Sequence, residues 1–155
     1  MDNNWLDLLQ NTNQLTKVVE TNKYTEQFGL TLSQQDAQLI LDNRKKTLSE
    51  QKRVEFGEGI TPKIIHEFCD SDFIDQNNYV DTIIRLQEIF YLYKNESMDE
   101  LTDDELINIM RNAFDEECQG SLEYLEETFL DNFARDIRAN TNRFIGRYTR
   151  DDEKI

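Results

Sequence analysis

Apolar side chains cover most of the helix surface in residues 79–93 when successive positions are turned by about 100°. The polar positions narrow to one stripe, Asp81, Arg85 and Glu88, whose spacing allows opposite charges to pair. A helix that is apolar nearly all round lies inside a bundle, and a stretch of 15 residues is too short to cross a membrane. The pattern therefore predicts a central helix over residues 79–95 that neighbouring helices must cover.

Helical periodicity also predicts elements on both sides of this central helix. Their first turns are marked by Ser33, Thr61, Thr102 and Ser121. Ser33 and Thr102 each precede an acidic residue three positions later, as in a capping box. Thr61 stands before Pro62, which favours the first position of a helix, so Thr61 is expected to be the N-cap.

We therefore expect an all-α, single-domain bundle of about five to seven helices packed around residues 79–95. A chain of 155 residues is long enough for one core. The chain has only one proline and five glycines, which are too few for the many turns of a β fold. We expect a loosely held segment with one or two short helices over 1–29, a helical domain over 30–138, and a C-terminal extension over 139–155.

The formal net charge of −15 limits the classes of partner. Such a surface repels nucleic-acid phosphates and anionic lipids, so we expect no direct nucleic-acid or membrane binding. The first ten residues lack a basic leader and a long apolar run, and two cysteines are too few for a disulfide framework. These features predict a cytoplasmic protein.

The negative charge is concentrated in residues 96–132, which contain 13 acidic residues and one basic residue, Arg111. One interpretation is a solvated helical surface that maintains solubility. The other is a docking surface for a partner protein with a basic surface. The carboxylates that flank the apolar stripes of two consecutive helices are the candidates for docking: Asp103, Asp104, Asp115, Glu116, Glu123 and Glu127.

Four short stretches resemble a small uncharacterised family of clostridial-type bacterial proteins, classed as a domain of unknown function. They are Arg53–Gly57, Phe68–Ser71, Leu86–Tyr91 running into Lys94–Ser97, and Glu117–Leu125. The resemblance implies a bacterial cytoplasmic protein and one domain over 30–138. It implies no activity, ligand or catalytic residue, and it leaves out the residues before about 24 and after 140.

Metal and cofactor chemistry is not expected. His66, Cys69 and Cys118 would need a carboxylate to complete a zinc set, but Cys69 falls on an apolar helix face and Cys118 has no second ligand beside it. Residues 70–81 superficially resemble a calcium loop, but Ile74 and Asp75 occupy positions that need an oxygen ligand and a glycine. We expect instead a polar loop whose Asp and Asn side chains cap neighbouring helices.

The predicted function is non-catalytic and works through protein contacts, because the sequence contains no phosphate-binding glycine loop, nucleophile elbow or dinucleotide fingerprint. Two alternatives remain: an enzyme that uses clustered carboxylates with a divalent metal, and an acidic nucleic-acid mimic that inhibits a nucleic-acid-binding protein. The arginines near the C-terminus resemble a small nucleic-acid-binding strip, but we favour ion pairs within the chain or self-association through the C-terminal extension. These arginines are Arg135, Arg138, Arg143, Arg147 and Arg150.

Overall fold

The computed structural model describes residues 4–57 and 59–139, and these residues form helices and connecting loops with no strand. Six helices of eight residues or more are present in the described part of the chain. They are α1 (Asn4–Glu20), α3 (Gln34–Glu50), α4 (Thr61–Phe68), α5 (Tyr79–Glu96), α6 (Asp103–Asp115) and α8 (Leu130–Arg138). The predicted all-α bundle of five to seven helices is confirmed.

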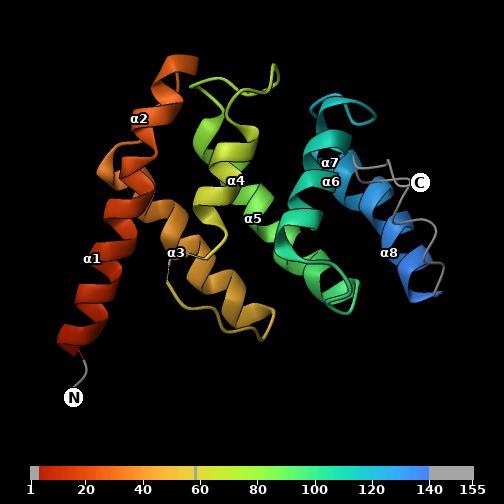
Figure 1. Cartoon of the computed structure of the whole chain (residues 1–155), viewed down its shortest axis with the longest axis horizontal. Coiled ribbons are helices and arrows are strands. Elements are labelled where there is room, and N and C mark those ends of the chain that lie inside the picture. The colour runs from red at the N-terminus through yellow and green to blue at the C-terminus, as the bar shows by residue number, and fades with distance from the viewer. Residues whose placement is uncertain (1–3, 58, 140–155) are drawn as a thin grey trace.

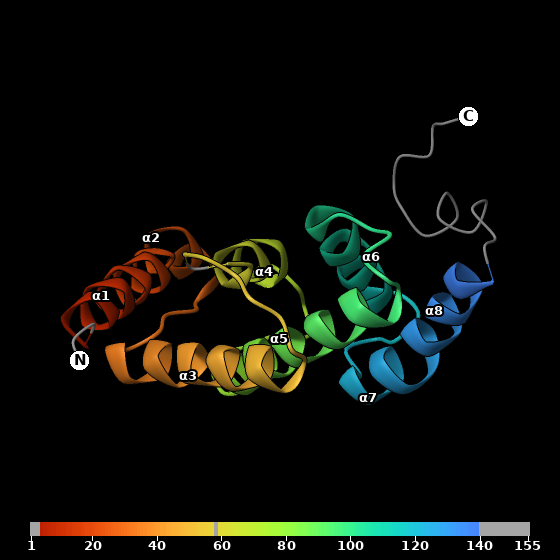
Figure 2. The same cartoon turned by 90° about the horizontal axis from the view of Figure 1, so that it is seen from below.

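Helix α5 is the centre of the bundle, as predicted, because it contacts α3, α4, α6 and α8. In Figure 1 it runs through the middle, with α1, α3 and α4 toward one end of the long axis and α6 and α8 toward the other. Figure 2, which is turned by 90° about the horizontal axis, shows the same order of helices along the long axis. Ile83, Leu86, Ile89 and Phe90 of α5 are completely buried and form the middle of the core.

Both predicted capping boxes are present. The Ser33 hydroxyl accepts a hydrogen bond from the backbone N–H of Asp36, and the Thr102 hydroxyl accepts one from the N–H of Glu105. The prediction for Thr61 is wrong, because Ile60 is the N-cap and Thr61 is already inside α4. The Thr61 side chain instead donates a hydrogen bond to the Gln87 side chain.

Gln87 is a buried polar residue in the middle of α5 that the helical periodicity did not single out. Its amide nitrogen donates to the carbonyl of Ile40 at 3.1 Å and to Asn43 Oδ1 at 3.2 Å, both in α3. Its amide oxygen accepts from Thr61 in α4. Because each polar atom finds a partner, Gln87 ties three helices together without an unsatisfied group.

The last helical segment is not one continuous α-helix. The short helix α7 (Leu122–Tyr124) begins at Ser121, whose hydroxyl caps it as predicted. It leads into the π-helical turn η2 (Leu125–Phe129) and then into α8. The wide turn places Leu125 and Leu130, five positions apart, both in the core. The Tyr93 hydroxyl donates to the carbonyl of Glu126 within this turn at 2.5 Å.

The N-terminal part contains a helix of 17 residues, α1, rather than only short helices. It contacts α3 and is followed by α2 (Asn22–Thr25) and the 3-10 turn η1 (Glu26–Phe28), which ends at Gly29 in the left-handed conformation. Val18 is fully buried, whereas Trp5, Leu8 and Leu9 are exposed. The division into 1–29, 30–138 and 139–155 stays a prediction.

Candidate functional site

The acidic segment folds into α6, the loop after it, and the α7–η2 region. The structure divides the six predicted docking carboxylates into two groups by their ion pairs. Three of them pair with basic side chains of the same molecule: Asp103, Asp104 and Asp115. The other three are exposed and make no ion pair with any residue between 4 and 57 or 59 and 139: Glu116, Glu123 and Glu127.

Asp103 and Asp104 begin α6 and pair with different helices. Asp103 Oδ1 lies 2.9 Å from the Nζ of Lys94, a buried lysine that also donates to the carbonyl of Leu101 at 2.5 Å. This carboxylate therefore compensates a charge that would otherwise be buried alone. Asp104 lies 3.0 Å from the Nζ of Lys63 in α4, and both of these side chains are exposed.

Asp115 belongs to a network around Arg111, the one basic residue of the acidic segment. Arg111 Nε donates to Asp115 Oδ2 at 2.6 Å, and Arg111 Nη1 donates to Asp70 Oδ1 at 2.7 Å and to the carbonyl of Glu67. The Ser71 hydroxyl adds a 2.7 Å bond to Asp115. Burial alone would lower the pKa of Arg111, but hydrogen bonds to Asp70 and Asp115 raise it. The network fastens α6 to the end of α4.

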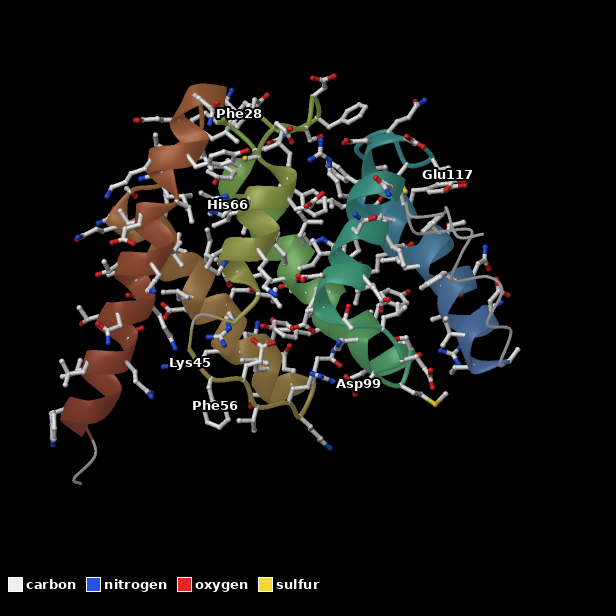
Figure 3. All side chains as sticks on the ribbon, viewed as in Figure 1. Phe28, Lys45, Phe56, His66, Asp99 and Glu117 are labelled. Carbon is white, nitrogen blue, oxygen red and sulfur yellow. The ribbon has the colours of Figure 1, made fainter. Side chains whose placement is uncertain are left out.

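The exposed carboxylates gather around the loop between α6 and α7. Glu116 ends α6, Glu123 lies in the first turn of α7, and Glu127 lies in the π-helical turn. Glu117 in the same loop is also exposed, and Figure 3 shows it at the edge of the molecule. The run of three acidic residues from 115 to 117 indicated Glu117 in the sequence, although the predicted docking set did not include Glu117.

Two aromatic side chains accompany these carboxylates. Phe73 is 40% exposed and Tyr124 is 47% exposed. Gly120 lies against the Phe73 ring with φ +84°, and an added Cβ would lie 2.6 Å from Phe73 Cγ, so only glycine fits both the conformation and the contact. We call this surface, made of Glu116, Glu117, Glu123, Glu127, Phe73 and Tyr124, the acidic end.

The three zinc candidates are not assembled into one site. His66 is exposed and its ring lies against Tyr24, with ring centroids 4.9 Å apart (Figure 3). Cys69 and Cys118 are buried, and this burial is the main reason that the pKa of each thiol is raised to about 11. The described residues contain no group of three or more histidine, cysteine or carboxylate side chains arranged to hold a metal ion.

The loop that superficially resembled a calcium site uses its polar groups internally. Asp75 Oδ1 accepts from the backbone N–H groups of Asn77 and Asn78 at 2.9 and 3.1 Å. Asn78 Oδ1 in turn accepts a hydrogen bond from the backbone N–H of Asp75 at 2.9 Å. The expectation that this loop caps the next helix is wrong for Asn78, because the N-cap of α5 makes no side-chain capping bond.

Two of the five arginines near the C-terminus lie in the described part of the chain. Arg135 pairs with Asp131 at 2.8 Å, an i, i+4 ion pair within the chain. Arg138 pairs with Glu96 Oε1 at 2.8 Å and also donates to the Glu96 carbonyl at 3.2 Å. Arg143, Arg147, Arg150 and the expected self-association through 140–155 lie outside the described residues.

One shallow hollow of about 290 Å³ lies between α4 and α6. It is lined by Lys63, His66, Glu67, Asp104, Ile107 and Asn108. The Lys63–Asp104 ion pair is part of this lining. Two of the charges at its border, those of Lys63 and Asp104, thus already compensate each other.

The fold and these surfaces define a small all-helical protein with a negatively charged end. The chain belongs to a family described as "Family of unknown function (DUF6323)", which matches residues 17–143. The resemblance to a family of unknown function is therefore confirmed, and the match is wider at both ends than the stretch from 24 to 140. No curated protein and no solved structure matches the chain. The helices of the described residues include none that is both long and apolar enough to span a membrane.

Proposed function

We propose that the protein is a non-catalytic, cytoplasmic binding protein whose acidic end docks a partner protein with a basic surface. The observation that carries this proposal is the unequal pairing of the six predicted carboxylates. Asp103, Asp104 and Asp115 serve the fold, whereas Glu116, Glu123 and Glu127 extend into solvent without an ion pair among the described residues. We therefore restrict the docking set to the exposed three and add Glu117.

Charge alone would make only a weak contact, because an exposed ion pair contributes about 0.2–1 kcal/mol. The acidic end also presents the partly exposed rings of Phe73 and Tyr124. Aromatic side chains contribute large apolar area at interfaces. A partner that presents lysines or arginines beside an apolar side chain would contact both the carboxylates and the aromatic rings.

The rival enzyme hypothesis receives less support from the placement of the carboxylates. Asp104 and Asp115 belong to opposite ends of α6, separated by about 16 Å at a rise of about 1.5 Å per residue. Ligands of a single divalent metal ion must converge within a few ångströms. The nucleic-acid mimic remains a narrower form of the docking proposal, in which the basic partner itself binds nucleic acid.

The test is a pull-down from native cytoplasm with three forms of the protein. They are wild type, the variant Glu116→Gln/Glu123→Gln/Glu127→Gln, and the matched control Glu20→Gln/Glu26→Gln/Glu100→Gln, which removes the same charge from exposed positions elsewhere. We expect wild type and control to retain a partner protein with a basic surface at low salt and to release it well above about 0.15 M, where charges are screened beyond about 8 Å.

The variant at the acidic end should not retain that protein. Equal recovery of every partner by wild type and this variant would refute the docking proposal. If DNA competes with the acidic end for the recovered protein, the partner is a nucleic-acid-binding protein and the mimic hypothesis is supported.

A further inference from the structure

The segment between α3 and α4 presents two apolar side chains to solvent. Val54 is 80% exposed and Phe56 is 86% exposed, the highest values among the large apolar residues of the described chain. Their neighbours Arg53 and Glu55 are much less exposed. Side chains therefore alternate along the segment, with charged groups directed toward the bundle and apolar groups directed away from it.

Glu55 anchors the segment to the bundle. Its Oε1 accepts hydrogen bonds from the Tyr91 hydroxyl at 2.5 Å and from Arg44 Nη2 at 3.1 Å. Arg44 is buried, so the Glu55 carboxylate compensates a buried charge. Gly59 has φ +61° and lies so close to Glu55 and Arg44 that an added Cβ would collide with both side chains.

Arg53 provides the second anchor. It donates to Asn95 Oδ1 at 2.5 Å and to Asp99 Oδ1 at 2.9 Å. The hydrogen bond from Arg53 is the main reason that the pKa of Asp99 is lowered. Asn95 in turn donates to the carbonyl of Gln51 at 3.0 Å. With an anchor at Arg53 and another at Glu55, Val54 and Phe56 are held outward before any partner arrives, which reduces the entropy cost of docking.

Exposed lysines lie close to these apolar groups in the sequence or in space. Lys45 lies on the same side of the molecule as Phe56 (Figure 3), and Lys46 and Lys52 follow it along the chain. Lys17 of α1 and Gly57 share the lining of a hollow of about 350 Å³, which Gln14 spans by donating to the Gly57 carbonyl at 2.6 Å. Lys46 is paired with Glu50 at 4.0 Å, so we leave it out and call the surface formed by Lys45, Lys52, Val54 and Phe56 the basic end.

We propose that the partner docked by the acidic end is the basic end of a second copy of this chain. The two ends lie on opposite sides of the molecule, with Phe56 at one and Glu117 at the other (Figure 3). Their charges are complementary, because exposed Lys45 and Lys52 accompany Val54 and Phe56, whereas the acidic end combines exposed glutamates with Phe73 and Tyr124. This inference rests on the function proposed above and names the partner.

The contact joins two different surfaces, so it is heterologous. A heterologous contact leaves one acidic end and one basic end unused in each dimer, and further copies add in a chain unless the rotation closes a ring. Few side chains take part on each copy, and interfaces of less than about 1,200 Å² are weak and transient. We therefore expect association that becomes visible at about 0.1–1 mM protein.

Sedimentation analysis with two complementary variants tests the arrangement. The first variant, Glu116→Gln/Glu123→Gln/Glu127→Gln, removes three charges of the acidic end and keeps the basic end intact. The second, Val54→Ser/Phe56→Ser, removes the apolar side chains of the basic end and keeps the acidic end intact. All five positions are exposed, and melting curves will verify that both variants fold. The control is again Glu20→Gln/Glu26→Gln/Glu100→Gln.

We expect the average mass of wild type to rise above 18.5 kDa with concentration and to fall back as salt increases. Each variant alone should stay monomeric, while their equimolar mixture should form a 1:1 dimer and stop there. The Gln variant and the control both change the net charge from −15 to −12. If overall charge repulsion controls association, both proteins should associate more strongly than wild type. If the acidic end docks the basic end, only the Gln variant at the acidic end should associate less.

Three results would overturn the inference: wild type that stays at 18.5 kDa up to about 1 mM, a Gln variant that associates as strongly as wild type, or a mixture that associates no better than its components. A monomeric wild type that still captures a basic cytoplasmic protein through its acidic end would leave the proposed function intact and reject only the second copy as partner. If wild type neither self-associates nor captures a basic cytoplasmic protein, both proposals are rejected.

Discussion

The Tyr91 hydroxyl donates a 2.5 Å hydrogen bond to Oε1 of Glu55, which lies 36 positions earlier in the chain. Tyr91 belongs to the central helix and Glu55 belongs to the segment that carries Val54 and Phe56. Burial, and then the hydrogen bond and the charge of Glu55, raise the pKa of Tyr91. The most exposed apolar side chains of the described chain are thus held in place from the core.

The first prediction compares two buried tyrosines of α5. Tyr91→Phe should lower the free energy of unfolding by about 1–2 kcal/mol, because it removes a partner of the buried Glu55–Arg44 pair. Tyr79→Phe should change it by less than about 0.5 kcal/mol. The Tyr79 hydroxyl lies beside Thr25, whose own hydroxyl donates to Leu30, and has no partner of hydrogen-bond geometry among the described residues. Urea unfolding of both variants measures the difference, and equal losses would contradict it.

The second prediction concerns two neighbouring isoleucines of α5. Ile83 is completely buried, whereas Ile84 is half-buried. Ile83→Asp should abolish cooperative unfolding, because an unpaired carboxylate in the core costs several kcal/mol against a total stability of about 5–15 kcal/mol. Ile84→Asp should unfold cooperatively at a lower temperature. Thermal melts monitored by circular dichroism test this prediction. A larger loss of stability for Ile84→Asp than for Ile83→Asp would contradict the assignment of Ile83 to the core-facing side of α5.

The third prediction separates the structural carboxylates from the exposed ones. Asp115→Asn should cost about 1–2 kcal/mol, because it weakens the hydrogen bonds of Arg111 and Ser71. Glu116→Gln should be neutral or stabilising by a few tenths of a kcal/mol, because a negative charge at the end of α6 is unfavourable to the helix dipole. Denaturant midpoints of the two single variants test this, and a larger loss for Glu116→Gln would refute it.

The fourth prediction concerns alkaline pH. The pKa of Cys69 and that of Cys118 are each raised from 9.0 to about 11, chiefly by burial. Below pH 9 both thiols are protonated in the folded and unfolded chains. Between pH 9 and pH 11 the unfolded chain loses these protons while the folded chain keeps them, so the free energy of unfolding falls as pH rises.

Urea unfolding across this range should therefore show a steady loss of stability. Burial likewise raises the pKa of Tyr93 and of Tyr79 to about 12, which continues the loss above pH 10. The variant Cys69→Ala/Cys118→Ala should start from a lower stability but show a shallower fall between pH 9 and 11. A parallel fall in both proteins would show that the thiols do not contribute.

The fifth prediction concerns metal. Purified protein should contain no stoichiometric zinc, and a chelator should leave its melting temperature unchanged, because His66 faces solvent while the two cysteines are buried as thiols. Elemental analysis with a melting curve in the presence of chelator tests this. One zinc per chain that disappears in Cys69→Ser/Cys118→Ser would overturn it.

Sequence periodicity was sufficient to identify the central helix and the all-α class, because a helix that is apolar on most of its surface has only the interior of a bundle to occupy. The capping boxes at Ser33 and Thr102 were equally predictable, since both partners lie within four residues and the bond forms inside one helical turn. Local interactions of this kind can be predicted from the sequence because both partners are close together in it.

The roles of the charged residues were decided only by the tertiary structure. Asp115 and Glu116 are adjacent in the sequence, yet packing brings Ser71 and Asp70 to Asp115 and its partner Arg111, whereas Glu116 extends into solvent. Glu55 and Arg53 resemble ordinary surface charges until α3 and α5 bring Arg44, Tyr91 and Asn95 to them. A side chain's periodicity reports which face of its own helix it occupies, but many of its hydrogen-bond partners are brought to it by packing from about 40 positions away.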